Sequence, residues 1–222
     1  MAGRESPSRP FCLHYIPPGG IWKILPMNNY SKMQEAARLR FLTYDFDQLC
    51  RHPAIRAEEK GLKFPFLGQG CYVNRETGEI LIENRKADFA ESLTVYDWLC
   101  DRKPNAQAAN DFCAINSLPG VLVSGGNLEL NGNNVAPLIA KNPERFLEIC
   151  KSMDGKQLDG ADLAVVIYPI PHLPVLLKFY EADEEFPPSL SLLWDKNILR
   201  FLRYETIYYL AGCLLKRFRG AL

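Results

Sequence analysis

The spacing of hydrophobic positions changes several times along this chain, and each change predicts a different element. Between residues 87 and 102, apolar side chains from Phe89 to Leu99 recur at three- and four-residue steps. This spacing is typical of an amphipathic helix, and Asp88 and Pro104 indicate its two ends. The same reasoning predicts helices from Ser31, as the capping residue, to residue 42, over residues 45–52 capped by Asp45, and over residues 135–139, 144–153 and 204–218.

Other stretches follow the two-residue period of strands. Residues 62–67, 71–74 and 79–82 read as short strands of a meander, with a tight turn at 75–78. The most strongly apolar runs are DLAVVIYPI at 162–170 and PVLLKFYEA at 174–182. Prolines are confined to their ends and to the connection between them, so we expect an antiparallel pair. The polar, Asn- and Gly-rich residues 103–134 predict a long loop with at most one short strand.

This order of elements predicts the fold class. The strands come in clusters, with helices before, between and after them rather than in strict alternation. The pattern favours an α+β fold: a single domain of antiparallel sheet elements with helices packed around them. We expect this domain to span residues 27–222. Residues 1–26 hold five prolines and three glycines without periodicity, which indicates a disordered tail or a misplaced start.

Charge and hydropathy then narrow the classes of partner. Twenty-six basic residues balance 26 acidic ones, so no overall field attracts nucleic acid or an anionic membrane surface. No apolar run approaches the ~20 residues that span a bilayer, and the N-terminal segment lacks the apolar core of a secretory signal. We therefore predict a cytoplasmic protein with neither a nucleic-acid nor a membrane partner.

The cysteines predict neither a disulfide framework nor a metal ribbon. There are seven, an odd number, spread widely among apolar neighbours. Cys100 and Cys113 are the closest pair, and their separation is far wider than the CxxC spacing of zinc and iron–sulfur sites. We expect no disulfide-linked partner. Cys71, between Gly70 and Tyr72, is the candidate for a reactive thiol, against the alternative of a buried structural one.

Motif searches leave the large nucleotide-binding and hydrolase classes without support. The chain contains no Walker A sequence, no dinucleotide fingerprint after a strand, no HExxH and no GxSxG. SGGN at residues 124–127 has the flexibility to hold a phosphate on backbone amides, although a simple turn explains it equally well.

The stretch FYEADEEFPP, residues 179–188, is the most concentrated set of charged side chains. Glu181, Asp183, Glu184 and Glu185 follow an apolar strand. Together with Asp195 they offer the oxygen ligands that a hard divalent cation prefers. Adjacent residues of an extended chain point in alternate directions, however, and a charged loop also keeps an apolar hairpin soluble. The sequence is compatible with both a metal site and a solvated loop.

Two further residues are candidates for ligand binding. His172 lies between prolines in the connection of the two strongest strands, where it can serve as a ligand-binding group or as a locally hydrogen-bonded turn residue. Trp194, in SLSLLWDKN, marks either the edge of a cofactor pocket or part of the core.

The same segments carry a family resemblance. LKFPFLGQGCYVNRETGEI and the C-terminal half, above all the hairpin followed by DEEFP and the LLWD segment, resemble the bacterial family catalogued as domain of unknown function 3786. The resemblance runs from about Met27 to the end of the chain and implies a bacterial cytoplasmic protein. Some relatives resemble fusions to a cysteine-rich iron–sulfur domain of corrinoid-handling proteins. This chain lacks that cysteine cluster.

Three functional hypotheses follow. The preferred one is a non-catalytic binding or accessory module for a small molecule or protein partner, linked to corrinoid or other cofactor metabolism. The alternative is a metal-assisted enzyme that uses the acidic loop at 181–185. A third is a structural protein that docks a partner through an aromatic face. The sequence assigns no cofactor and leaves enzymatic activity open.

Overall fold

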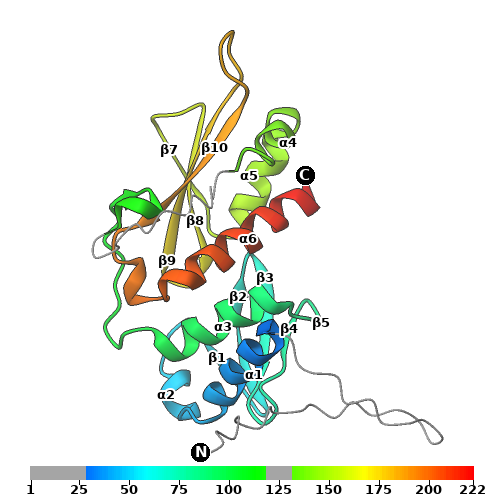
Figure 1. The fold of residues 1–222 in the computed structure, drawn as a ribbon, viewed down its shortest axis with the longest axis vertical. Helices are drawn as coiled ribbons and strands as arrows, with labels where there is room; N and C mark the ends of the chain where they lie inside the picture. Colours follow the sequence, from blue (N-terminus) through cyan, green and yellow to red (C-terminus); the bar gives the residue numbers. More distant parts are fainter. Residues whose placement is uncertain (1–28, 119–131) are drawn as a thin grey trace, which may run out of the picture.

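Two antiparallel sheets and the helices around them make up the described part of the chain. The computed structural model describes residues 29–118 and 132–222. One five-stranded sheet lies below the other in Figure 1, with helices packed against both. This arrangement confirms the α+β class. The tail predicted over residues 1–26 and the turn at 124–127 lie outside the described residues.

The first sheet is a meander in chain order. It contains β1 (Arg56–Glu58), β2 (Gly61–Phe66), β3 (Gln69–Asn74), β4 (Ile80–Ile82) and β5 (Arg85–Lys86). In β2, Leu62, Phe64 and Phe66 are buried while Lys63 and Pro65 between them are exposed, as expected when one sheet face meets the core. The three predicted strands are confirmed as β2, β3 and β4. The short outer strands β1 and β5 were not predicted.

The second sheet has the order β6-β10-β9-β8-β7. Its strands are β6 (Phe112–Cys113), β7 (Lys156–Leu158), β8 (Leu163–Ile170), β9 (Leu173–Tyr180) and β10 (Ser189–Asp195). The antiparallel pairing of β8 with β9 confirms the predicted hairpin. Strand β10 was not predicted, although its buried Leu190, Leu192 and Trp194 alternate as strand residues do.

A β-bulge joins the two sheets. The register of β8 against β9 shifts between Ile167 and Ile170, and within this bulge the carbonyl oxygen of Pro169 accepts a hydrogen bond of 2.7 Å from the amide of Leu67. Leu67 follows β2 and has a φ of 53°, a conformation that a leucine adopts only where tertiary contacts hold it. The bulge thus connects the end of β2 to β8.

The helices follow the predicted pattern closely, and two of the predicted caps are confirmed. They are α1 (Asn29–Leu42), α2 (Phe46–Cys50), α3 (Phe89–Asp101), α4 (Ala136–Lys141), α5 (Pro143–Ser152) and α6 (Tyr204–Ala221), with 3₁₀ turns at Ile115–Ser117 and Ile198–Arg200. Asp45 caps α2, and Asp88 forms a capping box with Glu91 at α3. The expected cap at Ser31 is wrong, because α1 already includes Asn29 and Ser31 lies inside it.

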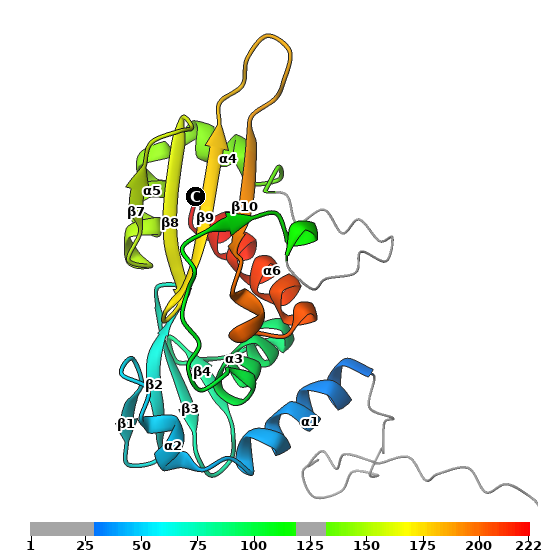
Figure 2. The same cartoon turned by 90° about the vertical axis from the view of Figure 1, so that its left-hand side faces the viewer.

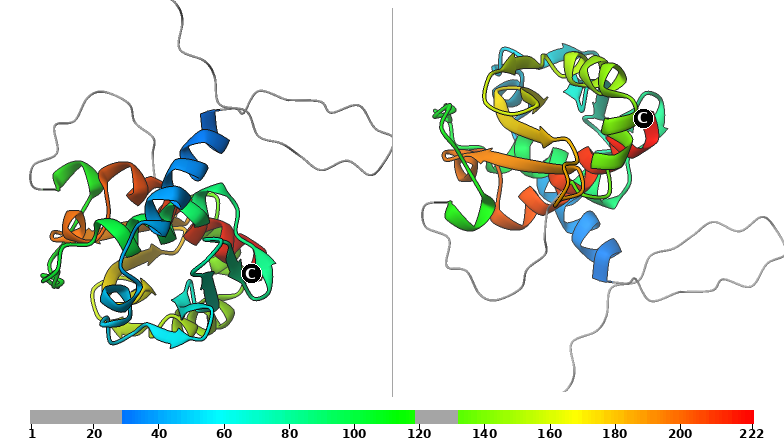
Figure 3. Two further views of the ribbon diagram at one scale, coloured as in Figure 1. Left: turned by 90° about the horizontal axis from the view of Figure 1, so that it is seen from below. Right: turned by 90° about the horizontal axis from the view of Figure 1, so that it is seen from above.

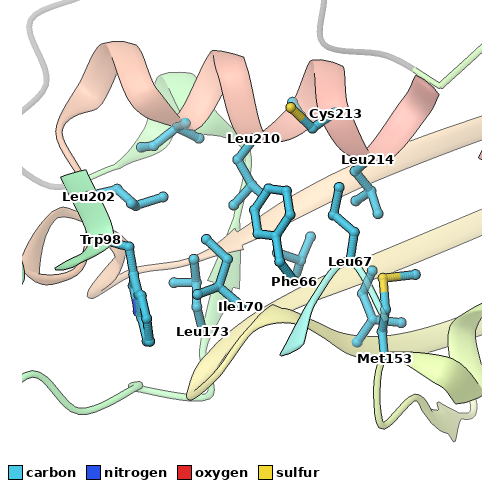
Figure 4. Packing of buried hydrophobic residues seen from close by; sticks show 14 of the residues in the cluster. Phe66, Leu67, Trp98, Met153, Ile170, Leu173, Leu202, Leu210, Cys213 and Leu214 are labelled. Atoms are coloured by element: carbon cyan, nitrogen blue, oxygen red, sulfur yellow. The ribbon is translucent and has the colours of Figure 1, made fainter. Parts of the chain in front are cut away.

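One hydrophobic core runs through both sheets and the helices between them. Leu210 of α6 points toward Phe66 of the first sheet and Ile170 of the second, and Leu214 points toward Leu67 (Figure 4). Helix α6 therefore packs over the end of β8 and the end of β2. No helix within the described ranges has the length and apolar character needed to cross a membrane.

A largely buried network of hydrogen bonds and ion pairs connects the three longest helices, α1, α3 and α6. Asp97 of α3 accepts hydrogen bonds from Thr206 of α6 and, at 2.5 Å, from Arg40 of α1. Arg40 and Arg203 both pair with Asp101, at 3.0 and 2.6 Å. Beyond this network, the N-terminal part of α1 projects from the rest of the described chain (Figure 3).

Candidate functional site

A cavity of about 570 Å³ lies near the end of α3, and Arg102, one of whose nitrogens is buried without a hydrogen-bond partner among the described residues, lines it. We call it the Arg102 pocket. Its walls come from α2 and the turn that follows it, the last turn of α3, the segment after α3 and the β8–β9 turn; Figure 2 shows that segment passing the β8–β9 turn on its way to β6. The lining residues are Tyr44, Gln48, Leu49, Arg51, His52, Pro53, Leu99, Cys100, Arg102, Pro104, Asn105, Ala106, Gln107 and His172.

Arg102 is positioned by the end of its helix. It follows the last residue of α3 with an extended ψ of 129°, and its guanidinium carbon lies 5.2 Å from the ring centroid of Trp98, one turn back. Its Nη1 atom is buried and finds no hydrogen-bond partner among the described residues. Burial lowers the pKa of Arg102 from its ordinary value, but an arginine still stays protonated at any physiological pH.

His52, in the turn after α2, contacts His172 of the β8–β9 turn in the pocket wall. Their ring centroids are 5.0 Å apart in an edge-to-face contact, and His52 also lies 5.2 Å from Trp98. His172 has a φ of 64° as the second residue of the two-residue β8–β9 turn, where a positive φ ordinarily favours glycine or asparagine. Burial, followed by the nearby Arg102 and His172, lowers the pKa of His52 to about 4.

Neither of the potential nucleophiles in the pocket wall is activated. Burial raises the pKa of the Cys100 thiol to about 12, so this cysteine stays protonated and unreactive at neutral pH. The hydroxyl of Tyr44 donates a hydrogen bond of 2.5 Å to the backbone carbonyl of Cys100, and burial also raises the pKa of Tyr44. Both side chains therefore have a structural role in the pocket wall.

The charged side chains that line the pocket are all basic. Arg51 and Arg102 line it, and none of its lining residues is an aspartate or a glutamate. Amide side chains of Gln48, Asn105 and Gln107 add neutral donors and acceptors. A concave site with cations and no carboxylates can hold an anion, since the anion supplies the negative charge that the lining residues do not provide.

The acidic loop lies at the far end of the second sheet from this pocket. Asp183 Oδ1 accepts the backbone amides of Glu185 and Phe186, at 2.8 and 2.7 Å, which closes a tight turn, and the carboxylates of Glu184 and Glu185 are exposed. In residues 29–118 and 132–222, no three or more His, Cys, Asp or Glu side chains are grouped as ligands of one metal ion. Metal binding by this loop stays a prediction.

Asp195 and Trp194 lie at the other end of β10. The side chain of Asp195 is 0% exposed and accepts the backbone amides of Ala109, Asn110 and Asn197 at 3.0, 2.7 and 2.8 Å. Since β10 keeps its two ends roughly 20 Å apart, Asp195 cannot share one ion with the acidic loop. Trp194 is fully buried in the core and is not among the residues that line the Arg102 pocket.

His172 is thus the one predicted ligand-binding residue that lies in the pocket wall, while the Arg102 and His52 side chains were not predicted. The i, i+4 spacing of Trp98 and Arg102 just before Pro104 was a usable signal for a stacked arginine at a helix end. No local signal links His52 to His172, because their contact depends on how the turn after α2 packs against the β8–β9 turn. Cys71, the candidate reactive thiol, is buried, and burial raises its pKa far above the ordinary value.

Comparison with known proteins identifies one family. The family model described as "Domain of unknown function (DUF3786)" matches residues 45–217, more than half of the chain. The match includes every residue that lines the Arg102 pocket except Tyr44. No curated protein and no solved structure matches the chain.

Proposed function

We propose that this chain, which belongs to the domain of unknown function 3786 family, is a non-catalytic binding module that holds a small anionic molecule in the Arg102 pocket. One observation carries the proposal: the Nη1 atom of Arg102 is buried without a hydrogen-bond partner among the described residues. A buried donor on a charged group is costly unless something accepts its hydrogen bond. An anionic ligand supplies that acceptor and the compensating charge.

The size and composition of the pocket support this proposal. Its volume of about 570 Å³ falls within the roughly 300–1,000 Å³ that is usual for small-molecule sites. Apolar side chains such as Leu49 and Leu99 line it beside a few polar groups, a combination that lets the apolar part of a ligand be buried while the polar groups set its orientation.

The protonation states in the wall favour binding over catalysis. A nucleophile needs a neighbouring base or a depressed pKa, whereas burial raises the pKa of the Cys100 thiol to about 12. The Nδ1 atom of His52 already accepts a hydrogen bond, from the backbone amide of Ala54, so it is not free to take a proton from a substrate. The link to corrinoid or other cofactor metabolism stays a prediction that the mass of the bound molecule will test.

We expect Arg102→Met to weaken ligand binding strongly while leaving the fold intact. Losing a buried charge that pairs with the ligand should weaken binding about 30-fold or more. The ligand-free variant should melt at or above the temperature of the wild type, because methionine fills the space beside Trp98 without an unpaired charge. Native mass spectrometry of protein purified from its host, together with sulfate titration, measures the binding, and differential scanning calorimetry the melting.

Two variants make this test specific. Arg56→Met removes an exposed arginine on β1 that does not line the pocket, and it should bind like the wild type. Arg102→Lys keeps the charge but loses the planar fork, so it should bind weakly. A wild-type protein that carries no anion and does not bind sulfate, phosphate or acetate would overturn the proposal, as would an Arg102→Met variant that binds normally.

The metal-assisted alternative has its own test in the acidic loop. We expect millimolar Mg²⁺ or Mn²⁺ to change the melting temperature of the wild type and of the Asp183→Ala/Glu185→Ala double variant equally, because exposed carboxylates screened by water bind such ions only weakly. Calorimetry with and without the metal measures both shifts. A clear metal-dependent stabilisation of the wild type that disappears in the double variant would favour the enzyme instead.

A further inference from the structure

A hydrogen bond within its own turn determines which ring nitrogen of His52 carries the proton. The backbone amide of Ala54, two residues on, donates a hydrogen bond of 3.2 Å to Nδ1 of His52. An imidazole nitrogen that accepts a hydrogen bond carries no proton, so the single hydrogen of the neutral ring is on Nε2. This contact makes His52 a hydrogen-bond donor at one defined atom.

That donor belongs to a residue of the pocket wall. Nε2 of His52 has no hydrogen-bond partner among the described residues, yet it is absent from their buried unpaired atoms; it is therefore accessible. His52 lines the Arg102 pocket, while the neighbouring cavity beyond His172, of about 310 Å³, does not include it. Nε2 is thus an accessible donor on a residue that lines the same pocket as Arg102.

The surroundings keep the ring neutral. The other titratable groups that line the pocket are Tyr44, Arg51, Cys100, Arg102 and His172, and none of them is a carboxylate. A proton on Nδ1 would break the bond to Ala54 and would place a second cation near Arg102. In agreement with this geometry, burial, Arg102 and His172 lower the pKa of His52 to about 4.

We infer that His52 is a specificity-determining residue, which donates its Nε2 hydrogen to an anionic oxygen of the ligand while Arg102 binds the same group from the end of α3. This inference rests on the proposed function and adds the chemical class of the ligand: a carboxylate, phosphate or sulfate group, recognised without proton uptake by His52. A ligand that places a donor at this position, such as the hydroxyl of a protonated acid or an amide N–H, sets a donor against the N–H of His52 and is rejected.

Two substitutions at position 52 distinguish the role of Nε2 as a donor to the ligand from the role of Nδ1 as an acceptor in the turn. His52→Gln places an amide N–H near the position of Nε2 but loses the acceptor for Ala54, whereas His52→Asn retains that acceptor in an Asx turn and loses the donor. We expect His52→Asn to weaken sulfate binding about 10- to 100-fold, the cost of a hydrogen bond to a charged group. His52→Gln should stay within a few-fold of the wild type. The reverse order, with His52→Asn binding well and His52→Gln poorly, would show a structural role and overturn the inference.

The pH dependence of sulfate binding provides a second test, which distinguishes a neutral His52 donor from a cationic His52. Sulfate keeps its charge across the range from about pH 5 to pH 8 in which an ordinary histidine titrates, so the Kd of sulfate for the wild type should be constant there. Tightening as the pH falls, absent from His52→Gln, would mean that His52 binds as a cation and would overturn the inference. Acetate and phosphate, titrated in parallel, distinguish a carboxylate site from a tetrahedral-oxyanion site.

The outcomes also separate this inference from the proposed function. If the wild type binds sulfate, phosphate or acetate and Arg102→Met does not, the proposed function stands. Equal affinity of His52→Asn and wild type for that anion then refutes the role of His52 alone. If the wild type binds none of the three anions, both proposals fail together.

Discussion

Asp195→Ala is expected to lower the free energy of unfolding by about 2–4 kcal/mol, because it leaves several backbone donors without an acceptor. The carboxylate of Asp195 accepts the amides of Ala109, Asn110 and Asn197. These bonds tie the segment after α3 to the end of β10, where Asp195 pairs with Phe112 of β6. Urea denaturation followed by circular dichroism measures the loss.

The isosteric variant Asp195→Asn provides the control. It keeps one acceptor oxygen but turns an NH₂ group toward a backbone donor, so a smaller loss of about 1–2 kcal/mol is expected. The predicted metal-binding role of Asp195 leads to a different result: alanine would then remove a metal-dependent stabilisation and leave the metal-free protein nearly as stable as the wild type. That result would contradict the structural role described here.

The second large effect is expected at Asp97, the centre of the network that joins three helices. We expect Asp97→Ala to cost about 2–4 kcal/mol, since it removes the partner of the mostly buried Arg40 and of Thr206. Arg40 retains its pairing with Asp101, which keeps the cost below that of a fully isolated charge. Thermal and urea unfolding should agree on the loss.

An exposed ion pair serves as the matched control for Asp97. Glu148 pairs with Arg145 at 2.7 Å on the surface of α5, with more than half of each side chain exposed to solvent. Glu148→Ala should therefore change stability by no more than about 0.5 kcal/mol. Equal losses at positions 97 and 148 would mean that the Asp97 network contributes no more than an ordinary surface pair.

Local chemistry explains why most of the fold could be predicted from the sequence. The caps at Asp45 and Asp88 satisfy backbone amides within three residues of themselves, so their effect can be read from a short window. The hairpin of β8 and β9 is equally local, because its two-residue turn brings Ile170 opposite Leu173. These features need no information from distant parts of the chain.

Apart from β10, the strands that were not predicted are two or three residues long and carry no alternating apolar pattern. All three residues of β7 are exposed, and this strand exists because β8 offers it unpaired backbone groups rather than because of its own side chains. Strand β10 did carry an alternating pattern in Leu190, Leu192 and Trp194. The two prolines and four carboxylates before it indicated a loop, and Trp194 was interpreted as the edge of a pocket or as part of the core.

The candidate site shows the same division more sharply. The sequence selected His172, Trp194, Asp195 and the acidic loop because of their residue types. The tertiary structure places Asp195 and Trp194 in the interior, moves the acidic loop to the far end of the sheet, and brings His172 against His52, whose rings lie 5.0 Å apart. Contacts between residues so far apart in the chain depend on the packing of whole sheets.

The sequence by itself therefore determined the fold class, most helices, the strongest strands and two caps, since each depends on hydrophobic period or on hydrogen bonds between near neighbours. Only the tertiary structure decided where the chemistry lies. The bulge that bonds Pro169 to Leu67 joins the two sheets. Segments distant in the chain, from α2 to the β8–β9 turn, line the pocket of Arg102, one nitrogen of which is buried without a partner among the described residues. Such burial is a property of the packed core, which no short window of residues encodes.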